Sequence, residues 1–449
     1  MQATEQTTLA DKLDYTKACE YIERAASLGS RPGLARIGRL LDILHNPEKS
    51  LRFIHVAGTN GKGSTSAMIS SALYEAGITV GMYYSPALNG IRDHYAVNGK
   101  LISEDDYAQA VSLVAAANEK LISETGDGAT QFELETAVAL TYFSENHCDV
   151  VVLECGMGGK DDATNIVGNK ICCVITSVSF DHMQYLGDTL SKIASAKAGI
   201  ITSDCPVIAY DSSDEVIDVI RKRCYETGSR LYPVDPAMIS YEDAPGGETV
   251  SFEEFRRVTV GLAGAFQAEN AALALRTLSV IRDNDLIAGT ITDENIGRGL
   301  ANVSWPFRFE LINEEPPVYI DGAHNPDAAA KLRRSVLDRL RGYKLIFVIG
   351  VFADKDYDAI VRTFSDIAYM FITVQTPDNA RALSANDLAA CAIRYCENVV
   401  AFENIDEAYD RALFECRIAD GPAAVIACGS LSYLGALREA AIESRKDGD

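Results

Sequence analysis

Short apolar runs rich in β-branched residues recur along the chain, and turn residues and then a helical spacing of apolar positions follow each run. Continuous apolar runs that alternate with helices are typical of a parallel sheet covered on both faces. The runs predict strands at residues 52–57, 150–154, 171–177, 207–210, 318–321, 345–350, 371–374 and 423–427. The helical spacing predicts helices at residues 64–76, 104–125, 267–282, 326–340 and 405–418. We therefore expect an α/β fold.

The alternation is interrupted between residues 299 and 315, where Trp305-Pro306 and a polar stretch precede a fresh strand at Val318. A length of 449 residues suggests two or three domains, since domains usually have about 100–200 residues. We place the boundary after residue 304, with a larger domain at 1–304 and a smaller one at 305–449. The segment 233–247, rich in Pro, Gly and acids, is expected to form a loop or a small β-excursion within the first domain.

The charge balance limits the classes of partner. The chain has 41 basic and 64 acidic residues and a formal net charge of −23. We expect no nucleic-acid binding, which needs a clustered basic surface, and no binding to an anionic membrane. A local nest of backbone N–H groups together with Mg²⁺ can still hold ATP on an acidic protein.

Three sequence features bear on the cellular compartment of the protein: its first residues, the length of its apolar runs and its cysteines. Residues Met1–Ala10 have neither the basic start nor the apolar stretch of a signal peptide. No apolar run reaches the roughly 18 residues that a membrane span requires. The 11 cysteines show no paired CxxC spacing and several lie in apolar runs, which indicates reduced core thiols rather than disulfides or a zinc site. We expect a cytoplasmic protein.

A glycine-rich segment lies between the first predicted strand and a helix, and reads Gly58-Thr59-Asn60-Gly61-Lys62-Gly63-Ser64-Thr65. This context suits a phosphate loop, in which glycines turn backbone N–H groups toward one point and the helix N-terminus adds partial positive charge. Lys62 can balance the β- and γ-phosphates of ATP. The alternative is a glycine-rich turn without a ligand, although two glycines that flank a lysine at a helix start have little packing value.

The spacing of this loop separates it from the commonest P-loops. Only Thr59 and Asn60 lie between its first glycine and the Gly61-Lys62 pair, where four residues are usual. Gly63 also occupies the position of the Mg²⁺-binding hydroxyl. That role must therefore fall to Ser64, Thr65 or a residue elsewhere.

Polar residues at strand ends are further candidates. Glu154 ends an apolar run, which places its carboxylate at the carboxyl edge of the sheet, where ligands bind in open α/β sheets. His182 follows another run, and Lys197 lies in a mostly small and apolar helical segment. Each has a simpler interpretation: a solvated strand-end Glu, a structural His and a Lys whose stem packs on apolar surface. Asn325 could cap a helix that has Pro326 at its first position.

Taken together and in order, these segments resemble the folylpolyglutamate/dihydrofolate synthases, a family of the Mur-ligase superfamily. The resemblance begins at Gly33-Leu34-Ala35-Arg36-Ile37 and continues through the glycine-rich loop. It then includes Ser85-Pro86, Thr130-Gln131-Phe132-Glu133, Glu154-Cys155-Gly156, Asp162-Ala163-Thr164-Asn165, Ser179-Phe180-Asp181-His182, Lys197-Ala198-Gly199, Gln267 with Asn270, Trp305-Pro306 with Arg308, Asp321-Gly322-Ala323-His324-Asn325-Pro326, Lys355-Asp356 and Gly429-Ser430-Leu431.

The resemblance implies a two-domain Mur-ligase-like fold, with a P-loop domain followed by a smaller Rossmann-like domain. It implies an ATP- and Mg²⁺-dependent ligase that adds L-glutamate to a folate, to dihydropteroate or to both. Such a ligase converts a carboxylate into an acyl phosphate, which the amine then attacks. Mg²⁺ is needed to screen the triphosphate from the anionic carboxylate. Members of this family are usually monomers.

By the same resemblance, individual residues receive roles. Lys62, Lys197 and His324 would be catalytic, with His324 near the phosphate and the acyl group. Residues that bind ATP would be Gly58, Thr59, Asn60, Gly61, Lys62, Gly63, Ser64, Thr65, Asn270, Arg308 and Asp321. Two Mg²⁺ ions would be held by Ser85, Glu154, His182 and Lys197, the last as a carbamate formed with CO₂. Lys355 and Ser430 would bind the incoming glutamate.

Several positions depart from the family pattern. They are Ala87, Asp93-His94-Tyr95, Lys160-Asp161, Ala196 and Phe307. Some of them fall where family members meet the pterin or folate, so the resemblance supports ligase chemistry more firmly than the identity of the acceptor. The alternatives are a Mur-type amide ligase with a different carboxylate acceptor and a nucleotide-dependent regulatory protein without turnover. Glu154, His182, Lys197 and His324 disfavour the second, because a switch needs no second metal site.

Overall fold

The computed structural model describes residues 12–88, 90–202, 204–377 and 381–446. These residues form two compact units. The first unit includes the chain up to Val178, His182–Pro236 and Leu273–Leu300, and the second includes Ser179–Asp181, Ala237–Ala272 and the chain from Ala301 onward. The boundary after residue 304 stays a prediction, since the chain passes between the units more than once.

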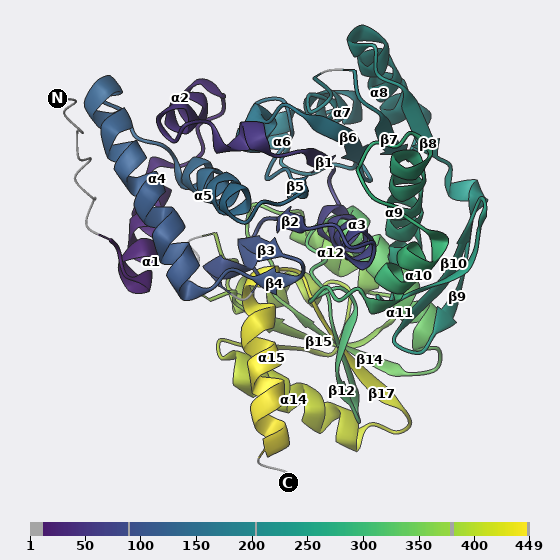
Figure 1. The fold of residues 1–449 in the computed structure, drawn as a ribbon. Helices are drawn as coiled ribbons and strands as arrows, with labels where there is room; N and C mark the ends of the chain where they lie inside the picture. Colours follow the sequence, from purple (N-terminus) through teal and green to yellow (C-terminus); the bar gives the residue numbers. More distant parts are fainter. Residues whose placement is uncertain (1–11, 89, 203, 378–380, 447–449) are drawn as a thin grey trace, which may run out of the picture. The chain divides into compact units, whose positions relative to one another are not determined.

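The first unit is built on an eight-stranded sheet with strand order β4-β3-β2-β5-β1-β6-β7-β8 (Figure 1). Strands β2, β5, β1, β6, β7 and β8 run parallel, and β3 and β4 add an antiparallel edge. The strands are β1 (Phe53–Ala57), β2 (Val80–Tyr83), β3 (Tyr95–Val97), β4 (Lys100–Leu101), β5 (Val150–Glu154), β6 (Lys170–Ile175), β7 (Val207–Tyr210) and β8 (Leu231–Val234). The predicted mostly parallel sheet is confirmed.

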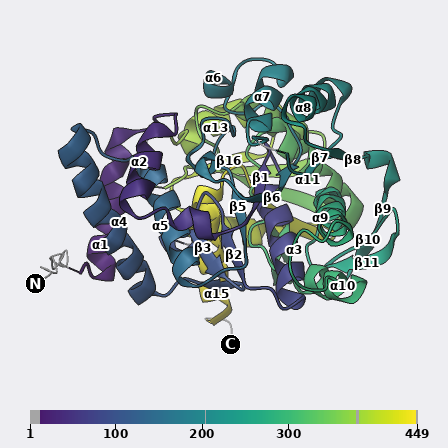
Figure 2. The same ribbon diagram turned by 45° about the horizontal axis from the view of Figure 1, so that its top comes forward.

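Helices cover this sheet. They are α1 (Tyr15–Arg24), α2 (Ala35–Ile43), α3 (Lys62–Glu75), α4 (Glu104–Thr125), α5 (Gln131–Glu145), α6 (Met183–Leu186), α7 (Leu190–Ala198), α8 (Asp214–Thr227) and α10 (Asp293–Asn302). Figures 1 and 2 both show α1, α2, α4 and α5 grouped together, apart from α3. One buried apolar cluster joins this helix group to Phe53, Tyr83, Val151 and Leu153 of the sheet. Helix α9 (Ala265–Asp283) contributes residues to both units.

The second unit contains a six-stranded sheet of order β12-β13-β17-β14-β15-β16, in which only β12 is antiparallel. Its strands are β12 (Glu310–Glu314), β13 (Pro317–Ile320), β14 (Lys344–Ile349), β15 (Ala368–Val374), β16 (Val399–Phe402) and β17 (Ala423–Cys428). Its helices are α11 (Pro326–Arg339), α12 (Tyr357–Phe364), α13 (Ala385–Ala392), α14 (Ile405–Ile418) and α15 (Leu431–Lys446). This parallel arrangement agrees with the α/β prediction.

The β-excursion is also present, and it lies in the second unit rather than in the first domain as expected. Strands β9 (Ile239–Ala244), β10 (Gly247–Phe252) and β11 (Phe255–Val260) form a three-stranded antiparallel sheet. A buried ion pair helps to explain this placement. Glu248 is fully buried in β10, and Arg339 at the end of α11 binds its carboxylate at 3.0 Å. A contact between residues so far apart in sequence leaves no local signal.

Several strands were absent from the prediction, namely β2, β3, β4, β8, β12 and β16. Most are short or lie at a sheet edge, and β4 and β8 have exposed or half-buried positions. The core thiols were predicted correctly: all eleven cysteines are free, and eight of them, including Cys155 and Cys428, are buried. Across the described residues, no helix has both the length and the apolar character required to cross a membrane.

Candidate active site

The glycine-rich loop connects β1 directly to α3. Gly61 has a left-handed conformation (φ 87°) and precedes Lys62, the first residue of the helix. The two residues that follow β6 hold the loop: Thr59 N donates to Ser177 O at 2.7 Å, and Thr176 Oγ1 donates to Asn60 O at 2.7 Å. The backbone therefore has the strand–turn–helix geometry that a phosphate cradle needs.

Gly58 has no space for a side chain. A Cβ at this position would overlap Thr176 Oγ1 and lie 2.9 Å from Thr176 Cβ. The carbonyl oxygen of Gly58 also accepts a hydrogen bond from Lys197 Nζ at 2.6 Å. The first glycine of the loop is thus fixed by contacts from two distant segments as well as by its own conformation.

The predicted phosphate-binding side chains lie at the start of α3. Lys62 Nζ donates to Thr59 O at 3.2 Å and lies 3.8 Å from Glu154 Oε1. Ser64 and Thr65 are both buried in the first turn, and Thr65 Oγ1 is a buried hydroxyl without a hydrogen-bond partner among the described residues. A buried unpaired hydroxyl is costly unless a ligand satisfies it. Thr65 therefore suits the hydroxyl role that Gly63 cannot fill.

The four predicted metal-binding residues all lie in the first unit. Glu154 is the buried last residue of β5, Ser85 follows β2, His182 immediately precedes α6, and Lys197 is buried near the end of α7. Among the described residues, no group of three or more His, Cys, Asp or Glu side chains is arranged to hold a metal. The unmodified amine of Lys197 acts as a donor, so it is not a ligand in this form.

This donor set fits Mg²⁺ better than a metal that needs a complete protein cage. Mg²⁺ is usually held by one or two carboxylates together with waters and substrate phosphates. Glu154 supplies one buried carboxylate beside Lys62, and Ser85 and Thr65 supply hydroxyls. The residues present are therefore compatible with an ion that arrives with the nucleotide.

A cavity of about 680 Å³ occupies the first unit. It is lined by segments that are far apart in the sequence, namely residues 29–33, 85–87, 130–133 and 156–163, together with Ala26, His94, Glu135, His182, Tyr185, Leu186 and Ala196. Its walls combine apolar surface from Phe132, Met157 and Leu186 with acidic groups. Ligand pockets of enzymes have this size and this mixture of surfaces.

Strand β5 connects this cavity to the phosphate loop. Its last residue, Glu154, lies beside Lys62, and the residues from Gly156 to Ala163 line the cavity. Within this stretch Asp162 is buried, which raises the pKa of its carboxyl. Met157 N and Thr164 N donate to its two oxygens at 2.8 and 3.0 Å and oppose that rise in pKa. Asp162 therefore stabilises the turn that follows β5 and lines the cavity.

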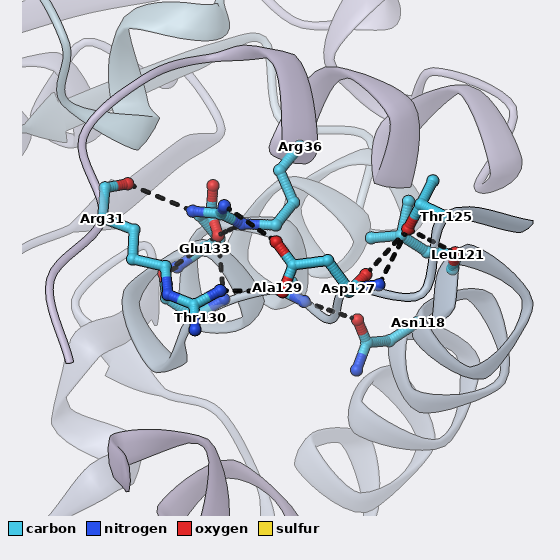
Figure 3. A network of polar contacts seen from close by, with 9 residues as sticks. All are labelled: Arg31, Arg36, Asn118, Leu121, Thr125, Asp127, Ala129, Thr130 and Glu133. Carbon is cyan, nitrogen blue, oxygen red and sulfur yellow. Dashed lines mark hydrogen bonds and ion pairs between the residues drawn. The ribbon is translucent and has the colours of Figure 1, made fainter. Parts of the chain in front are cut away.

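One wall of the cavity is held by a polar network around Arg36, shown in Figure 3. Arg36 Nε donates to Glu133 Oε2 at 2.7 Å, and Arg36 Nη2 donates to Arg31 O at 3.1 Å. Asp127 accepts from Arg31 at 2.7 Å and from Arg36 at 3.5 Å. Glu133 also completes a capping box with Thr130 at the start of α5. The network fastens the segment 29–33 to α5.

The remaining predicted residues lie in the second unit. Asp321 is buried, and its two oxygens accept from Phe309 N and Ala323 N, each at 2.8 Å. Burial raises the pKa of Asp321 to about 6, opposed by Arg308 and these two N–H groups. Arg308 Nη1 donates to Phe307 O at 2.9 Å, and Asn270 Nδ2 donates to Gln267 Oε1 at 2.9 Å.

His324 and Lys355 meet at a residue that the sequence analysis had not placed among the site residues. Lys355 Nζ lies 2.6 Å from Asp181 Oδ1, and His324 Nε2 lies 3.6 Å from Asp181 Oδ2. His324 Nδ1 bonds to Gly322 O at 2.9 Å, which orients the ring. The capping role of Asn325 is confirmed, since its side chain accepts from Ala328 N and Pro326 begins α11. The signal for Asp181 was its position next to His182.

Comparison with known proteins agrees with this geometry. Residues 56–278 match the model of the Mur ligase middle domain, and residues 307–431 match that of the Mur ligase glutamate ligase domain. The chain thus contains both of these Mur ligase domains.

Individual relatives define the family more closely. The dihydrofolate synthase/folylpolyglutamate synthase of Bacillus subtilis is 36% identical over 381 residues, which cover 83% of this chain and 88% of that protein. Folylpolyglutamate synthase of Mycobacterium tuberculosis, complexed with ADP and AMPPCP, superposes with a TM-score of 0.85 at 29% identity, over 95% of this chain and 99% of that chain. Escherichia coli FolC in complex with DHPP and ADP superposes with a TM-score of 0.84 at 27% identity. This match covers 98% of this chain and 100% of that chain. The chain belongs to the folylpolyglutamate/dihydrofolate synthase family.

Proposed function

We propose that this chain is an ATP- and Mg²⁺-dependent ligase that adds L-glutamate to a folate, to dihydropteroate or to both, through an acyl phosphate. The observation that carries the proposal is the position of β5, whose end joins the phosphate loop at Glu154 to the cavity at Gly156. A carboxylate acceptor bound in the cavity would reach the γ-phosphate of ATP from this strand end. The proposal agrees with family membership and with the names of the relatives.

Within this proposal, the loop residues Gly58–Thr65 bind the triphosphate and Lys62 balances its charge. Asn270, Arg308 and Asp321 bind the nucleoside, and His324 acts near the transferred phosphoryl group. Lys355 and Ser430 bind the carboxylate of L-glutamate. The amine of glutamate forms a bond to the acyl carbon as the acyl–oxygen bond breaks, and inorganic phosphate and a proton are released.

Mg²⁺ supplies charge neutralisation between the triphosphate and the acceptor carboxylate. Ser85, Glu154 and His182 are the proposed protein ligands. Lys197 is proposed to react with CO₂, forming an N–C bond and releasing a proton, so that its carbamate is a further ligand. The burial of Lys197 supports this, since burial favours the neutral amine that must react. An inactive Lys197→Ala protein should regain activity with added short-chain carboxylates, whereas a purely structural lysine would not be replaced in this way.

A substrate panel tests the function directly. Purified protein should release ADP and phosphate only when L-glutamate is present together with dihydropteroate or a reduced folate. Mass spectrometry of the product then shows whether one glutamate or a chain has been added. Glutamate-dependent ADP release with a different carboxylate, and none with any pteridine, would favour the alternative Mur-type ligase. A monomeric state and a cytoplasmic location are part of the proposal, and the free thiols agree with a reducing compartment.

A further inference from the structure

Two thiols of the first unit lie close together although 32 residues separate them. Cys173 lies within β6, and Cys205 lies in the segment between α7 and β7. Their sulfur atoms are 3.7 Å apart and share a hydrogen bond. Cys173 pairs in register with Val207 of β7, and Cys205 comes two residues before Val207. Because alternate residues point to the same face of a sheet, both thiols lie on one face, within the same buried cluster.

The neighbours of Cys205 favour its ionised form. Lys170 begins β6, and its Nζ donates to Ile200 O at 2.6 Å and to Thr202 Oγ1 at 3.2 Å, on the segment that leads to Cys205. The hydrogen bond from Cys173 lowers the pKa of Cys205, and the charge of Lys170 lowers it further, against the effect of burial. The same hydrogen bond, together with burial, raises the pKa of Cys173. Cys205 therefore has the character of an attacking thiolate, beside a second thiol that can complete a disulfide.

Cys205 is also the member of the pair that a small oxidant reaches first. It is 4% exposed and follows the exposed Asp204, whereas Cys173 is completely buried. Two neighbouring thiols differ from it: Cys172 is the adjacent residue of β6 and points to the opposite face of the sheet, and burial raises the pKa of Cys224 to about 11. Proximity to a second thiol, a nearby cation and access to the surface coincide at Cys205.

The two thiols belong to segments that hold the phosphate loop. Thr176, three residues after Cys173, donates through its hydroxyl to the loop carbonyl of residue 60 at 2.7 Å. Lys197 lies in the helix that precedes Cys205, and its Nζ donates to Gly58 O at 2.6 Å. A covalent bond between these two segments therefore acts on both supports of the loop.

We propose that Cys173 and Cys205 form a redox modification site, whose disulfide is produced by reaction with a peroxide and weakens the binding of ATP. The thiolate of Cys205 attacks one oxygen of the peroxide, the O–O bond breaks, and hydroxide leaves as a sulfenic acid forms. The sulfur of Cys173 then attacks the sulfenic sulfur, the S–O bond breaks, and the thiol proton leaves with the hydroxyl group as water. Both sulfurs are oxidised and the peroxide is reduced.

Formation of this bond brings the sulfur atoms from 3.7 Å to about 2.05 Å. The approach displaces β6 and the segment after α7 relative to each other, and the loop that both hold moves with them. The site goes beyond the proposed function, which uses neither thiol.

Peptide mapping tests the bond. The reduced full-length protein is treated with hydrogen peroxide, free thiols are alkylated, and tryptic peptides are analysed by mass spectrometry. We expect a dithiothreitol-sensitive link between peptides 171–192 and 198–221, the second of which has Cys205 as its one cysteine. In Cys173→Ala the sulfenic acid of Cys205 should persist and react with a 1,3-diketone. Absence of the link, a link from Cys205 to Cys224, or a 1,3-diketone adduct on Cys173 in Cys205→Ser overturns the inference.

Calorimetry with ATP and Mg²⁺, without an acceptor, tests the consequence. Oxidation should raise the Kd of the wild-type protein for ATP by at least about 10-fold, because misplacing a binding group by about 1 Å can cost about 100-fold. Dithiothreitol should restore the affinity. Cys205→Ser and Cys173→Ala should show no change on oxidation, and either variant suffices if the other fails to fold. An unchanged affinity of the oxidised wild type overturns the inference.

Cys172→Ala is the matched control, because Cys172 is completely buried in the same strand and faces away from Cys205. It should keep both the disulfide and the change in affinity, and loss of either would overturn the assignment to Cys173. Neither measurement needs an acceptor or L-glutamate. A disulfide that weakens ATP binding in a protein without glutamate-dependent ADP release therefore supports the inference and contradicts the proposed function.

Discussion

The phosphate loop and the cavity wall belong to the same unit, yet they are built in opposite ways. The loop is eight consecutive residues from Gly58 to Thr65, which lie between one strand and one helix. The wall is assembled from at least five separate segments, and its order depends on long-range pairs such as Arg36 with Glu133. We infer that a chemical step common to many substrates can be encoded locally, whereas recognition of one acceptor requires contacts that only the folded chain brings together.

The largest effect should come from the loop. Lys62→Ala should lower kcat by at least about 10³-fold, because it removes the cation that balances the β- and γ-phosphates. ADP release at saturating ATP and acceptor measures this change. Lys192→Ala is the control, since Lys192 forms an exposed pair with Asp188. Near-normal turnover of the Lys62→Ala protein would remove the loop from the mechanism.

The second largest effect tests whether the loop depends on a contact with a residue distant in sequence. Gly58→Ala should raise the KM for ATP by about 10–100-fold, because its Cβ would overlap the side chain of Thr176 and displace the loop. Steady-state kinetics with varied ATP measures it. Adding Thr176→Ala should recover part of the loss, so the two substitutions should not be additive. Gly168→Ala, where a Cβ would meet nothing within 4 Å, should leave the KM unchanged. Strict additivity would show that Thr176 is not the obstacle.

The smallest effect on the kinetic constants should come from a substitution in the cavity wall, which should nevertheless lower the stability of the protein. Arg36→Leu leaves the buried Glu133 without its cation, and should lower the free energy of unfolding by about 3 kcal/mol. The KM for the acceptor should rise less than about 10-fold, because the segment 29–33 loses one anchor, while the KM for ATP stays constant. Urea unfolding and kinetics measure the two effects.

The control for this variant is Arg39→Leu, which breaks the more exposed pair of Arg39 with Glu124 and should cost less than about 1 kcal/mol. The double variant Arg36→Leu/Glu133→Gln should be more stable than Arg36→Leu alone, because the buried charge has been removed. Equal stability of the two would mean that Arg36 does not stabilise the fold through its pair with Glu133. A parallel rise in the KM for ATP would show that loop and wall are not independent.

Much of the fold could be predicted from the sequence, because the signals for its central strands and helices are local. Continuous apolar runs identified the central strands, and the bounds of β5, β7, α4 and α14 were predicted to the residue. The capping of α11 by Asn325 followed from its neighbour Pro326. The edge strands β4, β8 and β12 were missed because they are short or interrupted by polar or exposed residues, whereas β16 was missed although its four residues are all apolar. The β9–β11 sheet was expected within the first domain and lies in the second unit, where Arg339 binds Glu248 from 91 residues away.

For the site, the sequence by itself determined the residues whose chemistry depends on their neighbours along the chain. The phosphate loop is the clearest case, since a strand, two glycines, a lysine and a helix start suffice to define it. Only the tertiary structure decided the cavity, the partners of Glu133, and the meeting of Asp181 with His324 and Lys355. The physical reason is that burial and charge pairing set the chemistry of these groups, and both depend on residues that are distant in sequence and adjacent only after folding.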